Sequence, residues 1–357
     1  MLLSEFDYEL PEELIAQQPL ERRDASRMLI VNRDAQTLQD SKFALLPEFI
    51  QPGDVIVVNN TRVFPARLIG RRDPSGGRVE VLLIRELESG KSSAALGGDA
   101  YQIWEALVQP AHRLKPGGRI RFHSNLHADV LEGSTKGFRL LKFEGDKPLG
   151  TLINELGQTP LPPYIRRPLG TSAADDDERY QTVFAREKGA IAAPTAGLHF
   201  TPQVTEALLE RQARVVEITL HVGYGTFQPV RVNHIELHRV DAEFYEIRED
   251  AARVINESRA EGGRVIAVGT TTVRALESAT NAEGIVESGK RETGLTIIPG
   301  HQFRITNALV TNFHLPRSSL LLLVCAFAGR NLTLDAYRHA VAAGFRFYSY
   351  GDCMLVI

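Results

Sequence analysis

The sequence predicts an α/β protein that carries a smaller all-β domain, a barrel or a sandwich, as an insertion. Strand, loop and helix patterns follow one another in the N-terminal part and again after residue 150. Between them, short β-rich runs are separated by turn residues about every 8 to 12 positions, with no helical period. At 357 residues the chain is also long for a single core. We therefore expect a discontinuous α/β domain (residues 1–62 and 151–357) and an inserted β-barrel domain (residues 63–150).

The residue pattern of the N-terminal part predicts one short helix and two strands. Glu12–Ala16 follow Pro11 as a short helix, and Met28–Val31 form an apolar strand after a polar segment. The turn Pro52-Gly53-Asp54 precedes the apolar run Val55–Val58, which has the length and composition of a buried strand.

The inserted region is basic, although the whole chain has a net charge of −3. Residues 61–150 contain 15 Lys and Arg against 10 Asp and Glu, a net charge of +5, and the rest of the chain sums to −8. A basic segment inside an acidic protein indicates contact with a polyanion such as nucleic acid. Ordinary scatter of surface charge explains the same counts equally well.

The stretch Gly189–Pro229 is predicted to contain two strands, each followed by a loop. Ala190–Ala193 are predicted to form a buried strand, and the loop after it contains His199. Thr201 and Pro202 then supply a helix N-cap and a first helical residue.

The second half of this stretch is an alternating strand followed by a glycine-rich loop. Val216, Ile218 and Leu220 are expected on one face, and Glu217, Thr219 and His221 on the other. The loop Gly223–Phe227 follows the strand. Two strands therefore lead into loops that carry or adjoin a histidine, which predicts a functional site.

The order of strand, loop and helix recurs twice towards the C-terminus. The segments are a strand at Arg264–Val268, a loop at Gly269–Thr272 and a helix at Val273–Ala279, then a strand at Ala308–Val310 and a helix at Ser318–Ala328. His314 lies in the second of these loops.

Polar residues thus follow four predicted strands, which end at Ala193, Val222, Val268 and Val310. In mostly parallel sheets such loops gather at the carboxyl ends of the strands and form the ligand site. This arrangement favours an enzyme. Gly269–Thr272 also begin a helix, where free backbone N–H groups and the helix dipole favour a carboxylate or a phosphate. These threonines can equally serve only as helix caps.

Several classes of protein are disfavoured by missing motifs. The chain has no G-x-x-x-x-G-K-[ST], no G-x-G-x-x-G and no G-x-S-x-G, which argues against a P-loop ATPase, a Rossmann dehydrogenase and a serine hydrolase. His234 and His238 are four residues apart but lack a Cys or carboxylate partner at zinc-site spacing, so we expect no metal.

The composition is typical of a cytoplasmic protein, with 43% apolar and 24% charged residues. The N-terminus MLLSEFDYEL has acids where a signal peptide has basic residues. The longest apolar run, Leu320–Ala328, is about half of the length needed to cross a bilayer. Cys325 and Cys353 form neither a disulfide framework nor a metal cluster. We expect no membrane association.

Long motifs are distributed over nearly the whole chain. They are FDYELPEELIAQQPLERRDASRML, GDVIVVNNTRVFPARL, LPPYI, APTAGLHFT, LHVGYGTFQPV, VGTTTVRALES, TNFHLPRSSLLLLVCAFAG and GFRFYSYGDCML. In content and order, these motifs resemble the S-adenosylmethionine:tRNA ribosyltransferase-isomerase (QueA) family of queuosine biosynthesis.

The resemblance implies a fold and an activity. The family fold is a larger, barrel-like α/β domain with a smaller β-barrel domain inserted, which agrees with the change of pattern near Val63. The activity is transfer and isomerisation of the ribosyl moiety of S-adenosylmethionine onto 7-aminomethyl-7-deazaguanine at the tRNA wobble position. Its products are epoxyqueuosine-tRNA, adenine and methionine. S-adenosylmethionine is then consumed as the ribosyl donor, and no retained cofactor is expected.

The implied reaction needs a base, because the sulfonium acidifies the neighbouring ribose C5′ hydrogen. A neutral histidine suits this role near pH 7. The catalytic candidates are His199 and His221, with His314 close by. A second group must assist the departure of adenine.

The family motifs also supply candidate substrate-binding residues. Arg27, Arg62 or Arg274 are candidates to hold the methionine carboxylate, and Asn59 and Asn60 to contact a purine or deazapurine edge. The full set is Asp24, Ser26, Arg27, Asn59, Asn60, Thr61, Arg62, Pro194, Thr195, Ala196, Gly197, Gly223, Gly225, Thr226, Phe227, Gly269, Thr270, Thr271, Arg274, Asn312, Tyr348 and Asp352.

The tRNA is expected to lie across both domains, with its phosphates on the basic inserted domain. The predicted contacts are Arg67, Arg71, Arg72, Arg113, Lys115, Arg119 and Arg121. The alternative to the ribosyltransferase is an S-adenosylmethionine-dependent RNA methyltransferase, and a noncatalytic RNA-binding protein is a third interpretation. The methyltransferase requires a glycine-rich loop after its first strand, which the sequence lacks. Nothing in the sequence suggests an oligomer interface, so we expect a monomer.

Overall fold

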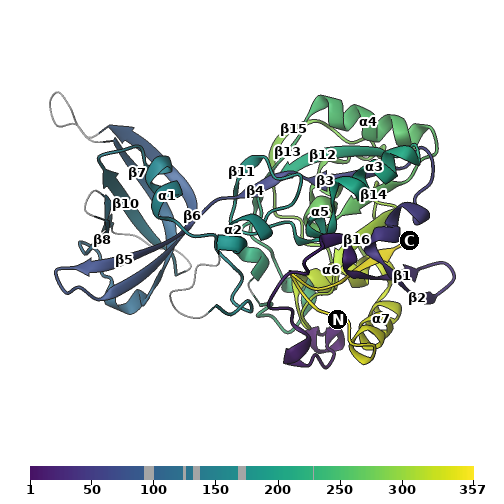
Figure 1. The fold of residues 1–357 in the computed structure, drawn as a ribbon, viewed down its shortest axis with the longest axis horizontal. Helices are drawn as coiled ribbons and strands as arrows, with labels where there is room; N and C mark the ends of the chain where they lie inside the picture. Colours follow the sequence, from purple (N-terminus) through teal and green to yellow (C-terminus); the bar gives the residue numbers. More distant parts are fainter. Residues whose placement is uncertain (92–99, 124–125, 132–136, 168–173, 228) are drawn as a thin grey trace. The chain divides into compact units, whose positions relative to one another are not determined.

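The computed structural model describes residues 1–91, 100–123, 126–131, 137–167, 174–227 and 229–357 (Figure 1). The chain divides into two compact units. The larger unit comprises Met1–Arg62, Pro162–Leu169 and Glu178–Ile357, and the smaller comprises Val63–Leu161 and Gly170–Asp177.

The first junction lies at residue 62, where the sequence places it, but the smaller unit extends past residue 150 to Leu161. The reason is helix α1 (Leu149–Leu156), which buries Leu149, Leu152 and Ile153 in the hydrophobic core of the smaller unit. The change from β-rich to helical pattern at residue 150 is therefore not a domain boundary.

The larger unit is built on one mixed sheet of nine strands. They are β1 (Arg27–Asn32), β2 (Thr37–Lys42), β3 (Val55–Asn59), β12 (Arg214–Leu220), β13 (Glu243–Ile247), β14 (Val265–Val268), β15 (Gly289–Thr293), β16 (Ala308–Asn312) and β17 (Cys353–Val356). Their spatial order is β15-β13-β12-β3-β14-β16-β17-β1-β2. The neighbours β12, β3, β14 and β16 are parallel to one another, whereas β17 and β1 form a parallel pair that runs the other way.

The central strands are continuous apolar runs because helices and loops cover both faces of the sheet. Every residue of β3, β14 and β16 is buried. The helices of this unit are α3 (Pro202–Glu210), α4 (Glu249–Ala260), α5 (Thr270–Ala279), α6 (Ser319–Ala328) and α7 (Arg330–Ala342). Helix α3 begins as the sequence predicts, because the Thr201 hydroxyl caps it by accepting from the Val204 N–H and Pro202 takes the first helical position.

Shorter elements complete the chain. A two-stranded sheet pairs β4 (Thr61–Val63) with β11 (Glu187–Ala190), and α2 spans Ala174–Arg179. Short 3-10 helices lie at Leu3–Phe6, Glu12–Leu14, Arg23–Ala25, Phe43–Phe49, Ala111–Arg113, Thr195–His199, Tyr224–Phe227 and Ile235–Leu237.

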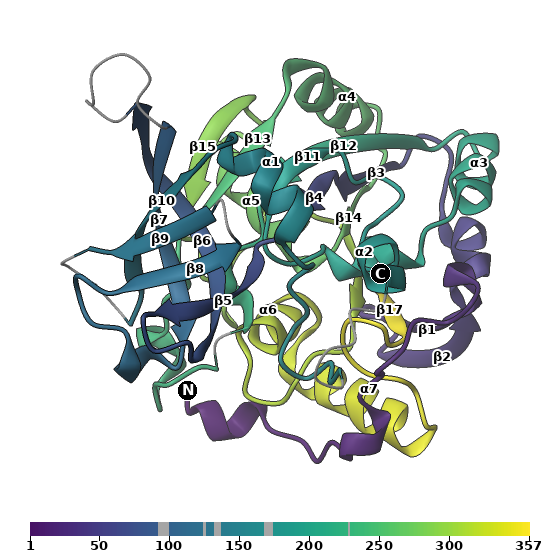
Figure 2. The same cartoon turned by 60° about the vertical axis from the view of Figure 1, so that its left-hand side comes forward.

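The smaller unit is a closed antiparallel barrel of six strands (Figure 2). The strands are β5 (Arg67–Asp73), β6 (Arg78–Lys91), β7 (Ala100–Gln109), β8 (Arg119–His123), β9 (Leu126–Val130) and β10 (Arg139–Gly145). Alternate residues such as Val79, Val81 and Leu83 of β6 point into its core. The predicted fold class, an α/β protein with an inserted all-β barrel, is confirmed.

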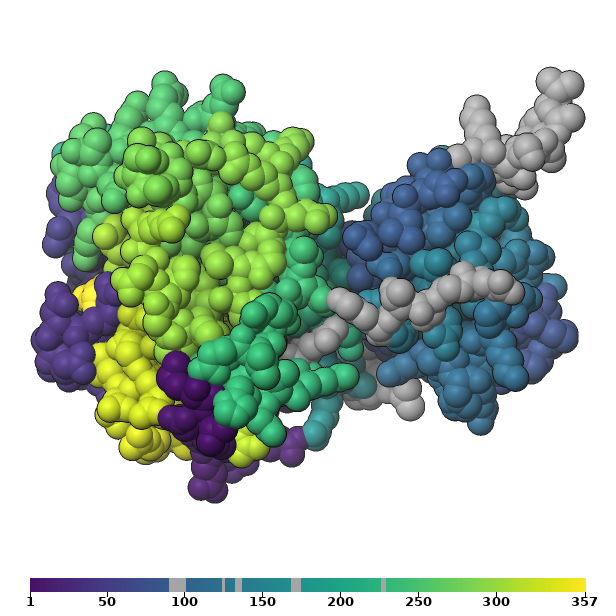
Figure 3. Space-filling model, turned by 180° about the vertical axis from the view of Figure 1, so that it is seen from behind, coloured from purple at the N-terminus to yellow at the C-terminus, as the bar shows by residue number. Residues whose placement is uncertain are grey.

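The N-terminal residues lie on the surface of the larger unit beside the segment near residue 235 (Figure 3). The Leu3 N–H donates to the Asn233 carbonyl at 2.8 Å, and the terminal amine pairs with Glu236 at 2.5 Å. No single helix among the described residues is long and apolar enough to span a membrane. Only α6 and α7 taken together have that length and composition, and they are bent by 117°.

Candidate active site

Six segments of the larger unit meet at one edge of its sheet. The carboxyl ends of β3, β12, β14 and β16 lie together because these strands are parallel. The amino ends of β1 and β17 reach the same edge because these two strands run the other way. In the register, Val268 pairs with Val310, and Cys353 pairs with both Asn312 and Met28. The predicted gathering of the loops after Val222, Val268 and Val310 is confirmed.

The loop that contains His199 reaches this edge by a different route. The strand predicted at Ala190–Ala193 ends at Ala190, where β11 ends, so it is not a strand of the main sheet. Ile191 instead donates its backbone N–H to the carbonyl of Val222 at 2.9 Å. This bond ties the loop to the end of β12, and the chain then turns through Thr195–His199.

His199 is buried at this edge, with 4% of its surface exposed. Its Nδ1 lies 2.8 Å from Oγ of Ser26, which directly precedes β1. The ring of Phe43 packs against the imidazole, with 5.2 Å between centroids. Burial lowers the pKa of His199 to about 4, so the ring is neutral near pH 7.

The other ring nitrogen of His199, Nε2, has only the Asn312 side chain as a nearby partner among the described residues. Nε2 is buried without a hydrogen bond, and so is Oδ1 of Asn312. Asn312 acts to raise the pKa of His199, while the nearby Arg23 and Arg346 lower it. Buried polar atoms are almost always paired, so either a contact between Nε2 and Oδ1 or a ligand bound beside them would satisfy these two atoms.

His314 is a second buried histidine, on the loop that follows β16. It is 6% exposed, and its Nε2 lies 2.8 Å from Oγ1 of Thr311. Its backbone is held on both sides: the N–H donates to the Tyr337 hydroxyl at 3.0 Å, and the carbonyl accepts from the Tyr8 hydroxyl. Burial lowers the pKa of His314 to about 3.

His221, directly after β12, is only half-buried. Its Nδ1 lies 2.8 Å from Oγ1 of Thr61, and its ring stacks on Phe244 at 5.5 Å. Burial lowers its pKa, and the carboxylates of Glu187 and Glu246 act in the opposite direction. Gly189 covers one side of the ring: a Cβ atom at this position would lie 2.7 Å from the imidazole, so only glycine fits.

The three histidines share one arrangement. Each has one ring nitrogen 2.8 Å from the hydroxyl of a Ser or Thr. Each hydroxyl also donates to a backbone carbonyl, that of Arg23 for Ser26 at 3.3 Å and those of Glu187 and Asn312 for the two threonines at 3.4 Å. A hydroxyl has a single proton, so wherever that proton goes to the carbonyl, the bonded ring nitrogen is the donor and the other keeps its lone pair. These contacts are compatible with a neutral tautomer that has a basic outer nitrogen in each of the three rings.

A small cavity of about 40 Å³ lies beside Asn312 and His314. Its walls include the rings of Tyr164, Tyr180 and Tyr348, together with Thr195. A second small cavity, of about 30 Å³, is lined by His199, Ser26 and Arg23. Ser349 lines both cavities, so they adjoin one another.

The two asparagines predicted to contact a purine are engaged by the backbone and by neighbouring side chains. Asn59 donates to the Leu220 carbonyl at 2.9 Å and accepts from the N–H groups of Thr61 and Leu220. Asn60 accepts from the Thr219 hydroxyl at 2.7 Å and donates to a carboxylate oxygen of Glu217 at 3.3 Å. Their amides therefore hold β3 against β12, and a base-reading role would require breaking these bonds.

Arg27 and Asp352 also have structural partners. The guanidinium of Arg27 lies over the Phe345 ring and donates to Asp40 and to the carbonyl of Ala343, both at 2.8 Å. Asp352 accepts from the backbone N–H groups of Arg27 at 2.9 Å and Arg346 at 2.8 Å. The prediction that Arg27 holds a carboxylate therefore lacks support from its contacts.

Arg274 is buried in an ion pair with Glu243, a residue that the sequence analysis did not single out. It also donates to the carbonyls of Leu295 at 3.0 Å and Thr293 at 3.2 Å. Glu243 in turn accepts from the Gly223 N–H at 2.8 Å. This pair fixes the glycine-rich turn beside His221 and already supplies Arg274 with a carboxylate partner. The nearby Gly225 packs against Asp241, while the side chains of Thr226 and Phe227 lie outside the described residues.

The amino end of α5 keeps the features of an anion site. Gly269 has φ +93° and begins the helix, and Thr270 and Thr271 are its first residues. Thr271 is 7% exposed, and its hydroxyl has no partner among the described residues. Thr272, by contrast, donates to the Val268 carbonyl at 2.7 Å. A buried hydroxyl and free helix N–H groups can together bind a carboxylate.

The remaining predicted residues are distributed around this edge. Asp24 is buried and pairs with Arg22, and Arg62 is exposed with no hydrogen bond or ion pair to a described residue. Pro194, Thr195, Ala196 and Gly197 form the turn before His199, and Tyr348 has φ +71°. Three residues that line the two small cavities, Arg23, Tyr164 and Tyr180, were not among the candidates predicted from the sequence. Arg23 and Tyr164 lie inside the quoted motifs ERRDASRML and LPPYI, whereas Tyr180 has no comparable signal.

The barrel carries a basic hollow of about 970 Å³. The cations that line it are Arg71, Arg72, Arg78, Arg119 and Arg121. Arg121 pairs with Asp73 at 2.7 Å and Arg119 with Asp129 at 2.6 Å, whereas the other three have no ion pair with a described residue. The hollow thus presents unneutralised positive charge.

Four of the seven predicted tRNA contacts, Arg71, Arg72, Arg119 and Arg121, therefore line one surface. Arg67 is instead paired with Glu80 through two hydrogen bonds of 2.7 and 2.8 Å. Arg113 and Lys115 do not line the hollow.

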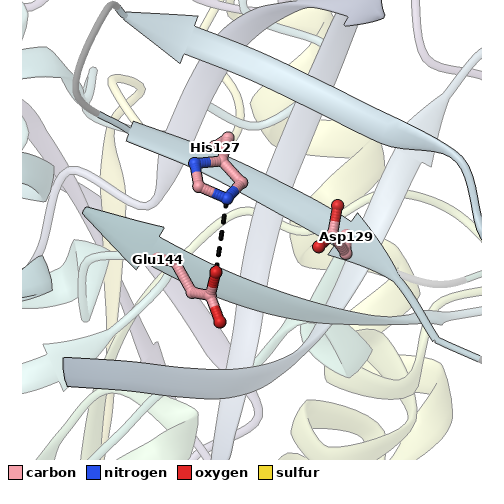
Figure 4. A group of neighbouring side chains, drawn as sticks. All are labelled: His127, Asp129 and Glu144. Atoms are coloured by element: carbon pink, nitrogen blue, oxygen red, sulfur yellow. Dashed lines mark ion pairs between the residues drawn. The ribbon is translucent and has the colours of Figure 1, made fainter. Parts of the chain in front are cut away.

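His127, Asp129 and Glu144 form a cluster on β9 and β10 whose ligand atoms lie within 4.8 Å of one another (Figure 4). Asp129 is already held by two bonds from Arg119, and Glu144 pairs with Lys142 at 2.7 Å. A divalent metal would have to displace both cations, so the cluster is better described as a network of ion pairs.

Comparison with known proteins covers the whole chain. The profile of the family described as queuosine biosynthesis protein matches residues 3–356. A protein of Moorella thermoacetica named S-adenosylmethionine:tRNA ribosyltransferase-isomerase is 48% identical over 359 residues, covering 100% of both chains. One of Natranaerobius thermophilus with the same name is 45% identical over 357 residues, covering 100% of this chain and 99% of the relative.

A solved structure agrees with these relatives. The crystal structure of S-adenosylmethionine tRNA ribosyltransferase from Thermotoga maritima is 37% identical, with a TM-score of 0.54, and the match covers 99% of this chain and 100% of that one. The resemblance seen in the motifs is confirmed: this chain belongs to the queuosine biosynthesis protein family.

Proposed function

We propose that this enzyme transfers and isomerises the ribosyl moiety of S-adenosylmethionine onto 7-aminomethyl-7-deazaguanine at the tRNA wobble position. The products are epoxyqueuosine-tRNA, adenine and methionine. The names of relatives that match the whole chain support this activity and disfavour the methyltransferase alternative. The single structural observation behind it is the buried, neutral His199 with an unpaired Nε2 at the sheet edge.

His199 is the proposed base. Ser26 holds Nδ1–H, so the Nε2 lone pair is available to take the C5′ proton that the sulfonium acidifies. The pKa of about 4 keeps the ring unprotonated over the whole neutral range. Ser26 is then a positioning residue, since it selects the tautomer without contacting the reacting atoms.

His221 is the proposed partner for adenine. It is less buried than the other two histidines, and although burial lowers its pKa, the carboxylates of Glu187 and Glu246 counteract that shift. Such a group can deliver a proton to the departing base more readily than His314, whose pKa of about 3 keeps it neutral.

The amino end of α5 is the proposed binding site for the methionine carboxylate. Free backbone N–H groups and the unpaired Thr271 hydroxyl are suitable donors for it. This assignment replaces Arg27 and Arg274, whose guanidinium groups have other partners.

The basic hollow of the barrel is the proposed contact for tRNA phosphates. Arg71, Arg72 and Arg78 offer charge that no described carboxylate neutralises. S-adenosylmethionine is consumed in the reaction, and we propose no retained cofactor. We also propose a monomer that acts in the cytoplasm without membrane contact.

Product analysis tests the activity. The enzyme is incubated with S-adenosylmethionine and tRNA that carries 7-aminomethyl-7-deazaguanine, and small molecules are quantified. We expect adenine and methionine in equal amounts, each matching the modified tRNA formed. S-adenosylhomocysteine as the product would identify a methyltransferase, and tRNA binding without turnover would identify a binding protein.

A further inference from the structure

The cavity beside Asn312 has an unusual lining for a site that must hold a charged substrate. Three tyrosines, Tyr164, Tyr180 and Tyr348, are among its lining residues, and none of the lining residues is an acid, a lysine or an arginine. Tyr164 and Tyr348 meet edge to face, with an angle of 88° between their rings. The cavity is therefore polarisable and aromatic but has no formal charge of its own.

The ionisable groups around this cavity stay neutral near pH 7. Burial raises the pKa of Tyr164, of Tyr180 and of Tyr348, so each phenol keeps its proton. Burial also lowers the pKa of His314, the one histidine in the lining, to about 3. A cation that enters thus meets neither a repelling imidazolium nor an attracting carboxylate.

Two buried polar atoms of the lining lack a hydrogen bond of normal geometry to the described residues. Oδ1 of Asn312 has only the His199 ring as a nearby partner among the described residues, while its amide nitrogen donates to the Tyr348 carbonyl at 2.9 Å. The Tyr180 hydroxyl is buried without a hydrogen bond of acceptable geometry, although Ser349 and the backbone of Ala193 lie near enough to lower its pKa against the effect of burial. An amide oxygen in the lining of a cavity supplies the negative end of a dipole there.

The backbone of Tyr348 is held in a costly conformation. Its φ of +71° lies in the left-handed region, which a bulky side chain rarely adopts. The Tyr348 N–H donates to the Phe313 carbonyl at 3.1 Å, and its own carbonyl accepts from Asn312. These bonds fix the ring in the wall of the cavity, and such strain is commonly found where a side chain must be aimed at a ligand.

We propose that Tyr164, Tyr180 and Tyr348 form an aromatic cage for the sulfonium group of bound S-adenosylmethionine. The inference rests on the proposed function, because it assigns one group of that substrate to one part of the site. Ring faces attract a cation through their quadrupole, and weakly hydrated onium ions are the cations that aromatic cages bind best. Oδ1 of Asn312 adds a dipole directed at the same charge.

The cage explains how the site can select its substrate. A divalent metal ion or a primary ammonium is usually held by at least one carboxylate, and this lining offers none. S-adenosylhomocysteine has the same shape apart from one methyl group, but its sulfur is an uncharged thioether and gains nothing from the ring quadrupole. The lining therefore favours the substrate over its demethylated analogue. It also places the sulfonium near Asn312 and hence near His199, the proposed base for the adjacent carbon.

The test compares the dissociation constants of S-adenosylmethionine and S-adenosylhomocysteine by calorimetry on the full chain. For the unaltered protein we expect the sulfonium to bind at least about tenfold more tightly. Tyr180→Leu and Tyr164→Leu should reduce that ratio towards unity, chiefly by weakening S-adenosylmethionine, while Tyr180→Phe should keep it. Retained S-adenosylhomocysteine affinity shows that the Leu variants are folded.

If a Leu variant does not fold, trifluorophenylalanine at position 180 keeps the ring shape and removes its negative face, and the same drop in ratio is expected. A ratio unchanged in these variants overturns the cage and leaves the proposed function intact. Failure of the unaltered protein to bind S-adenosylmethionine, with or without tRNA, overturns the proposed function and the cage with it.

Discussion

The sheet edge of the larger unit and the basic hollow of the barrel use polar residues in opposite ways. At the sheet edge, His199 and His314 are buried and neutral, and each is paired with a single hydroxyl. In the hollow, arginines such as Arg71 and Arg78 are exposed and charged. Burial maintains an unprotonated base and removes water from a reacting centre, whereas exposure lets a cation exchange its counterions for phosphates. This difference supports the proposal that the sheet edge carries the chemistry and the hollow binds RNA.

The largest expected effect is on catalysis at the sheet edge. His199→Gln keeps a polar side chain but removes the base, so kcat should fall by about 10² to 10⁴. The affinity for S-adenosylmethionine and for tRNA should stay within a few-fold of normal, as measured by equilibrium binding. His234→Gln, at an exposed histidine, is the matched control. Near-normal turnover by His199→Gln would remove this histidine from the mechanism.

The next effect is on stability, and it should be confined to the larger unit. The folded-state pKa values of His199 and His314, about 4 and about 3, lie below the unfolded value of 6.5. Well above pH 6.5 the two histidines are unprotonated in both the folded and the unfolded state, so they take nothing from the free energy of unfolding. As the pH falls below 6.5, only the unfolded state takes up protons, so each histidine costs about 1.4 kcal/mol of unfolding free energy per pH unit.

Hydrogen exchange between pH 6.5 and 5 can separate the two units. Peptides from β14 and β16 should lose protection steeply, and peptides from β5 and β8 should change little. His314→Gln should flatten the first slope. Equal slopes in both units would show that the buried histidines do not control stability in this range.

A smaller effect is expected for tRNA binding to the hollow. The double variant Arg71→Gln/Arg78→Gln removes two exposed charges that have no carboxylate partner among the described residues. It should weaken tRNA about tenfold and reduce the slope of log K against log salt by roughly 1 to 2. Arg85→Gln, on the same barrel but paired with Glu105 outside the hollow, is the control. An unchanged salt slope would place the tRNA elsewhere.

The sequence was sufficient for the fold class and for the gathering of three of the four candidate loops at the ends of neighbouring strands. Strand periodicity and turn spacing are local signals, and they identified the barrel, the buried strands β3 and β14, and the loops with His199, His221 and His314. The helix α1 was assigned to the wrong unit because its apolar face fits either core, and only the packing of Leu152 and Ile153 decides between them.

The roles of individual polar residues were less accessible. Asn59 and Asn60 follow a strand, as ligand-binding residues often do, but their partners Leu220 and Thr219 lie about 160 positions away in the sequence. The same limit hid the bond of Arg274 to Glu243. Hydrogen-bond partners depend on tertiary contacts, so a motif shows which residues matter without showing which of them are free to bind a ligand.

One measurement addresses the division of roles most directly. Single-turnover adenine release and tRNA affinity are determined together for the unaltered enzyme, for His199→Gln and for Arg71→Gln/Arg78→Gln. We predict that His199→Gln loses adenine release at saturating tRNA but keeps its tRNA affinity, and that the arginine variant loses affinity but releases adenine normally once saturated. The reverse pattern, or loss of both properties in both variants, would contradict the separation of chemistry and RNA binding.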